Sequence, residues 1–564
     1  QSCGSMNVQQ LIALNDRLRA NASGMQKLWR QTGAMCLTRK LSSLITASSS
    51  STTNDSNQTT APDIKLLNSV AVEANQTRAA GLMSWVMPFE GRWFQYEPAP
   101  QQKDNEAMKE WLNVCTDIAV NELRRSNFYT AIHEVLLDRS TYGTAVLWVS
   151  KGKDVSWRPS VSLNFRAWDA GRYAIGEDDE GFVDTIPREF ELSAAQAEEM
   201  FGREVLPPVV KSELAANRLD TRERYLHFIL PRNDADRQGK EGQAAMPIRS
   251  VYIHAPSKTI LRDSGFEEIP AIATRHLRWS EASAYGSSPA MQALAEIRGV
   301  NYLELLMSTL AETQVNPRLI LPQGYEGTPD LRAGGITFGG MTRDTWPQEW
   351  MTQGRIDFGM QFIERKEQAI KNAFHNKMFD AFGQLKGDPN IPHIMELKAE
   401  QLGRISPSFT LLTTEVINPV LARVFMILLR AGKFPQAPSE AFVADSLGQS
   451  GFFLPSAVQT NRMSQEMQQA KQGRFAQVFQ AFAGMAQAGR PEVMDNLDAD
   501  KTGRNLMNEA GLGELLVPID ARDSLRQQRA AAMQAQQQQA MLLEAAKNPE
   551  LVKQAAGALG GGEQ

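Results

Sequence analysis

The closest match to a chemical motif in this chain is a run of oxygen-bearing side chains at residues 498–509, spaced like a twelve-residue calcium loop. The ligands would be Asp498, Asp500, Thr502 and Glu509. Loop position 8, usually apolar so that paired loops can form a short sheet, is Asn505, and the chain has no second loop of this kind. The favoured interpretation is therefore an N-cap by Asp500 or Thr502 followed by an ordinary surface helix, without a bound metal.

The acidic turn Glu-Asp-Asp-Glu-Gly at residues 177–181 is a second candidate cation site. Turns favour Asp and Gly for backbone reasons alone, so a solvated β-turn is the favoured interpretation. The chain contains no phosphate-binding loop, no nucleophile elbow and no zinc motif. The scattered histidines are interpreted as packing or surface residues: His133, His227, His254, His276, His375 and His393. We therefore expect a protein without catalytic residues or cofactors.

Composition indicates a globular protein with several domains. A length of 564 residues suggests about three or four folded units. The net charge of −5 argues against a protein that grips nucleic acid through its phosphates, because such binding needs a basic surface. Cys3, Cys36 and Cys115 have no metal-type or disulfide-framework spacing and are interpreted as buried or free thiols. Residues 1–20 lack a signal-peptide pattern, and the apolar run 424–429 is too short to span a bilayer, so we expect a soluble protein made in the cytoplasm.

The elements that would position any site are helical at the N-terminus and β-rich in the middle. Apolar residues recur at three- and four-residue steps in four segments, which predicts helices at 6–46, 68–85, 105–127 and 128–138. A polar run at 47–60 predicts a flexible loop. Patterns typical of strands occur at 93–96, 142–149, 172–175, 224–230, 249–254 and 272–278. One helix at 193–201 has Ser193 as its expected N-cap.

Three long helices are predicted in the second half of the chain. Their ranges are 290–314, 356–382 and 395–430. Pro419 should kink the third helix near Glu415, because its ring removes a hydrogen bond and clashes one turn back. Shorter helices are expected at 456–515.

The terminal segment from Ser524 to Lys547 is rich in Ala, Gln and Met, without Pro or Gly, and so favours a helix. It has too few large apolar side chains to bury a face of its own. Such a helix is marginal in water, so it is either disordered or held by copies of itself. The sequence of this segment alone leaves both alternatives open.

Several stretches of the sequence point to one family. Residues 75–94 place a helix end, a Pro-aromatic turn and a Trp-Phe pair in succession, and Tyr-Gly-Ser-Ser-Pro at 285–289 opens a long helix. Residues 415–425, Glu-Val-Ile-Asn-Pro-Val-Leu-Ala-Arg-Val-Phe, are followed by Met-Asp-Asn-Leu-Asp-Ala-Asp-Lys-Thr at 494–502 and by the glutamine tract. With the order of elements, these stretches resemble the portal proteins, or head-to-tail connectors, of short-tailed podovirus-type phages. The resemblance covers nearly the whole chain, and it also weakens the calcium-loop interpretation.

The resemblance implies an α+β, predominantly helical portal fold that assembles into a ring. Its parts would be an N-terminal helical segment with a Ser/Thr loop (1–67), a wing (68–287 and 395–455), stem helices (288–315 and 351–382), a clip (316–350), a tunnel loop (383–394), a crown (456–520) and a C-terminal barrel helix with a frayed end (521–564).

The function implied is that of a structural, non-catalytic channel at one capsid vertex of the virion. The genome would be packaged through it and later ejected, and the tail would attach to it. The expected partners are other copies of the chain (usually twelve), the terminase large subunit, a tail adaptor protein, the major capsid protein, internal core or scaffold proteins, and double-stranded DNA, with no membrane. The alternatives are another virion component, such as an internal core or tail adaptor protein, and an enzyme with an unrecognised site.

The resemblance also assigns two sets of site residues. The tunnel loop would present Gln384, Lys386, Gly387, Asp388 and Asn390 to DNA. The clip would dock the tail adaptor through Arg318, Tyr325, Arg332, Arg343 and Trp346. Lys386 is the expected phosphate contact, and the alternative is a solvated loop lysine.

Overall fold

The computed structural model is a mixed α+β protein that divides into two compact units, residues 1–464 and 465–564. The structure describes residues 6–37, 66–98, 105–153, 162–237, 240–280, 283–315, 318–321, 323, 348–350, 356–380, 403–438, 442–444, 450–452, 455–460, 522, 524–529 and 531–535. In the second unit, the described residues 524–529 and 531–535 are helical, which agrees with the helix predicted from Ser524 onward.

The helices at the beginning of the chain lie close to their predicted positions. Their bounds are α1 (Val8–Cys36), α3 (Val70–Val86), α4 (Glu106–Arg125) and α5 (Phe128–Tyr142). Asn7 and Gln10 form a capping box at the start of α1, each side chain accepting from the other's backbone N–H at 2.9 Å. The prediction of a helix to residue 46 was wrong, because α1 ends at Cys36 and Leu37 leaves the helical conformation.

Two antiparallel sheets fill the middle of the chain. The smaller sheet has the order β3-β2-β9, and the larger has the order β4-β5-β6-β7-β8. Their bounds are β2 (Thr144–Lys151), β3 (Leu163–Trp168), β4 (Gly176–Glu177), β5 (Val183–Ser193), β6 (Arg222–Pro231), β7 (Ile248–His254), β8 (Thr259–Phe266) and β9 (Ala271–Arg275).

Side chains of the larger sheet point alternately to its two faces, and helices cover each of these faces. Tyr225 packs with helices α6 (Ala194–Phe201) and α7 (Pro208–Ala215). Its neighbour Leu226 points to the other face, where Leu11 of α1 covers the sheet. The predicted N-cap of α6 is confirmed, since the Ser193 hydroxyl accepts from Gln196 N–H within a capping box.

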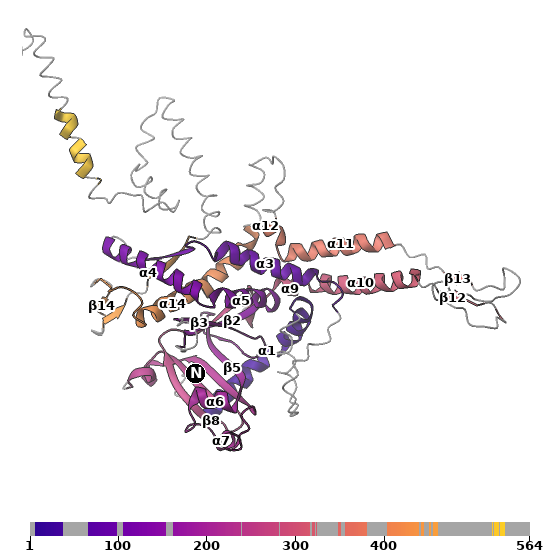
Figure 1. Cartoon of the computed structure of the whole chain (residues 1–564), viewed down its shortest axis with the longest axis horizontal. Coiled ribbons are helices and arrows are strands. Elements are labelled where there is room, and N and C mark those ends of the chain that lie inside the picture. Colours follow the sequence, from indigo (N-terminus) through magenta and orange to yellow (C-terminus); the bar gives the residue numbers. More distant parts are fainter. Residues whose placement is uncertain are drawn as a thin grey trace, which may run out of the picture. The chain divides into compact units, whose positions relative to one another are not determined.

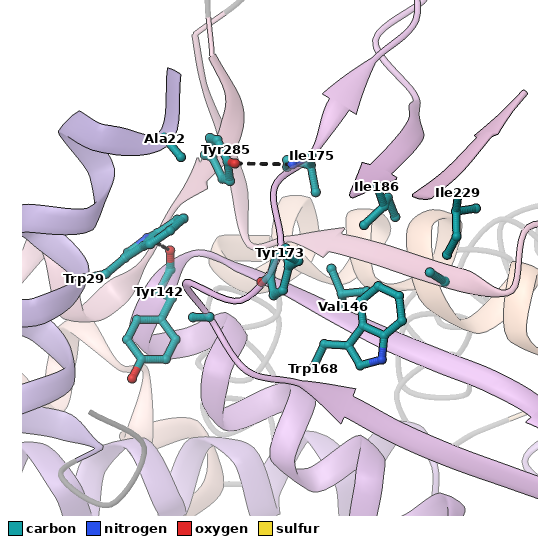
Figure 2. Packing of buried hydrophobic residues seen from close by; sticks show 12 residues of the cluster. Ala22, Trp29, Tyr142, Val146, Trp168, Tyr173, Ile175, Ile186, Ile229 and Tyr285 are labelled. Atoms are coloured by element: carbon teal, nitrogen blue, oxygen red, sulfur yellow. Dashed lines mark hydrogen bonds between the residues drawn. The ribbon is translucent and has the colours of Figure 1, made fainter. Parts of the chain in front are cut away.

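The core between α1 and the sheets is built from aromatic side chains, as Figure 2 shows. Trp29 of α1 donates its indole N–H to the carbonyl oxygen of Tyr142 at 2.8 Å, and its ring meets Tyr285 edge to face at 5.2 Å. The Tyr285 hydroxyl in turn accepts from the N–H of Ile175 at 3.3 Å. These contacts tie the N-terminal helix to the β-rich middle of the chain.

Helices α10 (Leu294–Val315) and α11 (Ile356–Ala373) run side by side away from the sheets, and a short hairpin lies near their far end (Figure 1). The hairpin strands are β12 (Arg318–Ile320) and β13 (Gln348–Trp350). Helix α9 (Pro289–Gln292) precedes α10, and its N-cap is Ser288, as the Ser-Ser-Pro sequence predicted. We call α10, α11 and this hairpin the arm.

The prediction of one uninterrupted helix over residues 356–382 was wrong. Helix α11 ends at Ala373 and α12 (Asn376–Asp380) begins after His375, whose φ of 58° is left-handed. A residue with positive φ cannot continue a right-handed helix, so the chain changes direction at this point.

The last long helix extends over Gly403–Arg430 and contains a π-helical turn, η5 (Thr413–Ile417), before α14 (Asn418–Arg430). The predicted disturbance of the hydrogen bonds near Glu415 is confirmed as a π turn before Pro419, which lacks the N–H that a regular helix would use. The kink expected at this point stays a prediction. By length and composition this helix could cross a membrane, but more than half of its most apolar window is buried inside the protein. It is a core helix of this unit.

Two strand predictions were wrong. Residues 172–175 form no ladder strand, although Tyr173 and Ile175 are buried, because only Tyr173 makes a bridge, to Arg188. Residues 272–278 belong to two strands, with His276 between them, and not to one. The first strand, β9, pairs with β2, whereas the second begins at Leu277 and pairs in a separate hairpin.

The remaining described elements are small. They are β1 (Phe94–Glu97) paired with β16 (Ser456–Gln459), the hairpins β10 (Leu277–Ser280) with β11 (Ser283–Ser287) and β14 (Phe442–Ala444) with β15 (Ser450–Phe452), helix α8 (Asp234–Arg237) and the 3-10 turn η3 (Gly242–Ala244). Strand β1 confirms the prediction at residues 93–96 to within one residue.

Candidate assembly surface and its buried base

The arm carries the largest group of uncovered apolar side chains among the described residues. In α10 only Leu294, Ile297 and Val300 are buried, all in its first two turns. Beyond them the large side chains are solvent-exposed, including Tyr302 at 61% and Leu305 at 50%. The exposed set on the arm is Tyr302, Leu305, Leu306, Val315, Ile320, Leu321, Phe358, Met360 and Phe362. Surfaces of this kind mark interaction sites, because a soluble monomer rarely leaves a large contiguous apolar patch in water.

Contacts between α10 and α11 hold the arm together as an antiparallel pair. A Cβ at Gly359 would lie 2.3 Å from the Sδ of Met307, so the glycine lets the helices approach closely. Nearer the base, Lys366 Nζ lies 2.5 Å from a carboxylate oxygen of Glu296 and 5.3 Å from the ring centroid of Phe362. Contacts between α10 and α11 therefore hold the two helices together, while the sides that face away from the partner helix remain exposed.

The base of the arm is buried in a cluster contributed by several helices. Ile370 and Phe374 are fully buried there, against residues of α1, α3, α9 and α10. The remaining buried members are Cys36, Val70, Ala71, Ala74, Ala290, Ala293, Ile297 and Val300. The arm is thus anchored at one end and free at the other, and any partner for its outer half must come from outside this chain's described residues.

A buried guanidinium occupies the end of α11 at this base. Arg78 of α3 donates to the carbonyl oxygen of Phe374 at 3.0 Å and to His276 Nε2 at 2.8 Å. The C-terminal carbonyls of a helix carry partial negative charge, so a cation is favourable there. Burial and the neighbouring Arg139 lower the pKa of Arg78 to about 9, which leaves it protonated at neutral pH.

The contact with Arg78 defines the protonation state of His276. A guanidinium can only donate, so Nε2 of His276 must accept and the neutral ring carries its proton on Nδ1. Burial and the charges of Arg78, Arg139 and His375 hold the pKa of His276 well below its ordinary value.

A second buried arginine joins the sheet to the π turn. Glu415 accepts from Arg275 three times: from its backbone N–H at 2.6 Å, from Nε at 2.8 Å and from Nη2 at 2.6 Å. Arg275 also forms an ion pair with Glu177 and donates to the carbonyl oxygen of Gly181 at 3.1 Å. The π turn therefore places Glu415 where it can bind both the backbone and the side chain of Arg275.

Arg139 of α5 connects these two sites. It donates Nε to the carbonyl oxygen of Arg275 at 3.1 Å and Nη2 to that of Ser408 at 2.6 Å. Because Arg275 precedes His276, hydrogen bonds and ion pairs connect the 177–181 turn to the end of α11 without a gap. We call Arg78, Arg139, Glu177, Arg275, His276 and Glu415 the basal network.

A cavity of about 420 Å³ lies beside the basal network, between α1, β4 and β11. Its lining combines apolar side chains, such as Leu18 and Ile175, with charged ones, such as Arg17 and Glu177. No group of three His, Cys, Asp or Glu residues within the described part of the chain is arranged to hold a metal ion. We find no catalytic constellation at this cavity.

Most of the predicted site residues lie outside the described residues. These are the calcium-loop set Asp498, Asp500, Thr502 and Glu509, the tunnel-loop set Gln384, Lys386, Gly387, Asp388 and Asn390, and the clip residues Tyr325, Arg332, Arg343 and Trp346. Only Arg318 is placed, at the start of β12 opposite Trp350. The loop predicted at residues 47–60 and residues 461–520 of the predicted crown also lie outside. The helices predicted from residue 456 were wrong at their start, because Ser456–Gln459 form strand β16, which pairs with β1.

The acidic turn differs from its predicted solvated form at one residue. Asp178 makes a local turn, its carboxylate accepting from the N–H groups of Glu180 and Phe182, which agrees with the backbone explanation. Glu177, however, is largely buried and ion-paired with Arg275. The sequence offered no signal for this pairing except an arginine inside an otherwise apolar strand pattern.

Two of the three cysteines are described, and both are free and buried. Burial raises the pKa of Cys36 and of Cys115 to about 12, so neither is a reactive thiolate at neutral pH. This confirms the interpretation of these two residues as buried thiols.

Comparison with known proteins identifies one family. Residues 8–517 match the family model described as bacteriophage head to tail connecting protein. The probable portal protein of Bordetella phage BPP-1 is 27% identical over 495 residues, covering 85% of this chain and 84% of the relative. The portal protein of Salmonella phage epsilon15 is 24% identical over 499 residues, covering 87% of this chain and 86% of the relative.

Proposed function

The chain belongs to the family of bacteriophage head to tail connecting proteins, and we propose that it serves as the portal protein of a short-tailed phage. In this role, copies of the chain form a ring at one capsid vertex, through which the genome is packaged and ejected and onto which the tail is attached. The role is structural, and no catalytic step is assigned to any residue. Both relatives described above carry the name portal protein.

The observation that carries the proposal is the arm. Two long helices, anchored at one end, expose aromatic and aliphatic side chains along their outer half. Burying one such side chain contributes roughly 1.5–3 kcal/mol, so several of them per copy supply a substantial driving force for association. A ring gives every copy two neighbours and leaves no arm uncovered.

The parts of the chain take their proposed roles from the resemblance to this family. Helices within 288–315 and 351–382 are the stem, residues 316–350 between them are the clip that docks the tail adaptor, and 383–394 are the tunnel loop. Residues 68–287 and 395–455 are the wing, 456–520 the crown and 521–564 the barrel helix. Arg318, at the start of β12, is the clip residue whose backbone is placed.

Charge is compatible with passage of DNA through such a ring. The net charge of −5 gives no general attraction for phosphates. A channel lined by charges of both signs lets DNA move through it without binding the DNA tightly. Lys386 is the proposed phosphate contact, and the further proposed partners are the terminase large subunit, the major capsid protein and internal core or scaffold proteins.

Negative-stain electron microscopy of the purified full chain tests the proposal. We expect end views of rings with a central hole, and native mass spectrometry of the same sample should give one closed oligomer. Particles that remain compact monomers at micromolar concentration would overturn the proposal and favour another kind of virion component.

A further inference from the structure

Side-chain contacts fix how α10 and α11 are turned towards each other. Met307 faces α11, as its contact with Gly359 shows. Asn68 Nδ2 donates to a carboxylate oxygen of Glu304 at 3.2 Å and to one of Glu367 at 2.8 Å. One amide group reaches both carboxylates, so Glu304 of α10 and Glu367 of α11 lie on the same flank of the arm.

The opposite flank is aromatic and apolar. A helix turns about 100° per residue, so Tyr302 and Leu306 lie on the side of α10 away from Glu304. By the same rule Phe358 and Phe362 lie on the side of α11 away from Glu367, and their rings stack at 6.2 Å. All four side chains are more than a third exposed. We call this set the apolar flank.

The charges of the arm are divided between the two flanks. Arg298 lies one turn before Tyr302, and Arg365 lies one turn after Phe362, so both basic residues belong to the apolar flank. Glu364 lies one turn before Glu367, on the acidic flank with Glu304. Lys371, nearer the base, is the basic exception there.

The acidic flank can also receive apolar side chains. Met360 lies one turn before Glu364 and is 54% exposed, and Val315 near the far end of α10 is 81% exposed. Aromatic side chains from another copy could therefore pack on Met360 and on the methylene groups of Glu364. If two apolar flanks met each other, Arg298 and Arg365 of both copies would be brought together, which like charges oppose.

We propose that neighbouring copies pack head to tail along the arm, the apolar flank of one copy covering the acidic flank of the next. Arg298 and Arg365 of one copy then face Glu364 of its neighbour, while Tyr302, Phe358 and Phe362 pack beside Met360. The contact is heterologous, as a closed ring requires. This inference rests on the proposed ring and assigns the two surfaces that form it.

Cysteine cross-linking in the assembled full chain tests this assignment. The variant Tyr302→Cys with Glu364→Cys, made in a Cys3→Ser background and treated with a short bismaleimide, should give a ladder of covalent multimers up to the complete ring on a denaturing gel. Each single variant should give no multimers. Tyr302→Cys combined with Glu241→Cys, an exposed position next to η3, is the matched control and should also give no ladder.

The outcomes separate this inference from the proposed function. Rings that form in the microscope but yield no ladder with the cysteine pair would overturn the assignment of flanks and leave the ring intact. Dimers formed by Tyr302→Cys alone would overturn it too, because they require apolar flanks to meet. Absence of rings in the untreated parent protein would overturn the proposed function itself.

Discussion

Arg275 forms ion pairs with two largely buried carboxylates, Glu177 and Glu415, and donates hydrogen bonds to each of them. The guanidinium of Arg278 also lies 3.5 Å from Glu177. Removing charges from water is costly, and only a fully bonded arrangement offsets that cost. The arginine also donates its backbone N–H to Glu415, so the carboxylate holds the strand and the side chain together. The pair of Arg275 and Glu415 therefore links the π turn to β9.

Replacing this arginine tests its contribution. Arg275→Met removes the cation that contacts both Glu177 and Glu415, and leaves Glu177 with the half-exposed guanidinium of Arg278 at 3.5 Å. The change should lower the free energy of unfolding by about 3–5 kcal/mol. Thermal melting of the purified variant measures the loss. Lys153→Met is the control, because its pair with Glu199 is exposed at both ends and should change stability by at most about 1 kcal/mol. Equal melting of both variants would show that the buried pair adds nothing.

His276 makes stability depend on pH. Its folded-state pKa is depressed by burial, by the facing cations Arg78 and Arg139, and by the neighbouring titratable ring of His375, whereas the unfolded chain takes up a proton below about pH 6.5. The unfolded state therefore binds more protons in acid, so the contribution of His276 is complete above about pH 6.5 and is lost as pH falls toward the folded pKa. The pKa of His375 is lowered to about 4, which adds a loss in the same direction between pH 6.5 and 4.

We expect the melting temperature to fall as pH is lowered from 7 to 5. His276→Gln should flatten this fall, because its amide oxygen can still accept from Arg78 without titrating. Melting curves of both proteins across this pH range provide the measurement. Parallel curves would show that His276 does not carry the pH dependence.

Among the elements, helices were predicted better than strands. The periodicity of apolar residues located α3, α4 and α10 to within a few residues, because a buried stripe along a helix repeats every three or four residues. The end of α11, in contrast, was predicted nine residues too late. Strand β5 was missed, since most of its side chains are only half-buried and show no clear alternation. Strand β8, at an edge of the same sheet, is mostly exposed and was missed for the same reason.

The positions at which helix α11 and the strand around His276 are interrupted depend on residues far away in the sequence. The local sequence could therefore not predict them. Helix α11 ends where Arg78, almost three hundred residues earlier in the chain, binds the carbonyl of Phe374. The strand around His276 divides because its two halves pair with different partners. Pro419 was different, since a missing donor is a local property and its effect one turn back was predicted correctly.

The packing of α12 on α3 gives a prediction for an element. A Cβ at Gly81 would lie 2.3 Å from the ring of Phe379, which also meets Trp85 edge to face at 6.2 Å. Gly81→Ala should therefore displace α12 and cost about 1–3 kcal/mol despite the better helix propensity of alanine. Melting temperature and the rate of limited proteolysis near α12 measure this effect.

The control for this prediction is another helical glycine. Gly24 in α1 has no atom within 4 Å of an added Cβ, so Gly24→Ala should leave stability unchanged or raise it by up to about 1 kcal/mol. If Gly81→Ala behaved like Gly24→Ala, the close contact with Phe379 would have no energetic importance.

For the whole molecule, the sequence indicated association before any surface was visible. The long helices of the arm carry one modest apolar stripe and many charges, a pattern that needs neighbours on more than one side, and the resemblance supplied the idea of a ring. Which flank meets which could not be predicted, because that depends on how α10 and α11 are turned towards each other. The contact of Asn68 with Glu304 and Glu367 provides that information.

The C-terminal helix gives a prediction for the assembly. Its described part exposes Leu525 and Met533 and contributes no buried side chain. Deleting residues after 521 should therefore leave the ring able to form and change only the appearance of one end. Native mass spectrometry and averaged side views of the truncated protein check both points. A truncated chain that stays monomeric would show that the terminal helix drives assembly.

The free end of the arm has a consequence for how the protein is made. A newly synthesised copy exposes the side chains of Tyr302, Leu306, Phe358 and Phe362 before any neighbour arrives. Ring assembly and aggregation then compete for this apolar surface, and the fraction of copies that reach the ring depends on the rate at which copies accumulate. Overproduction in isolation should therefore yield aggregates, whereas slower synthesis in the cold should enrich closed particles.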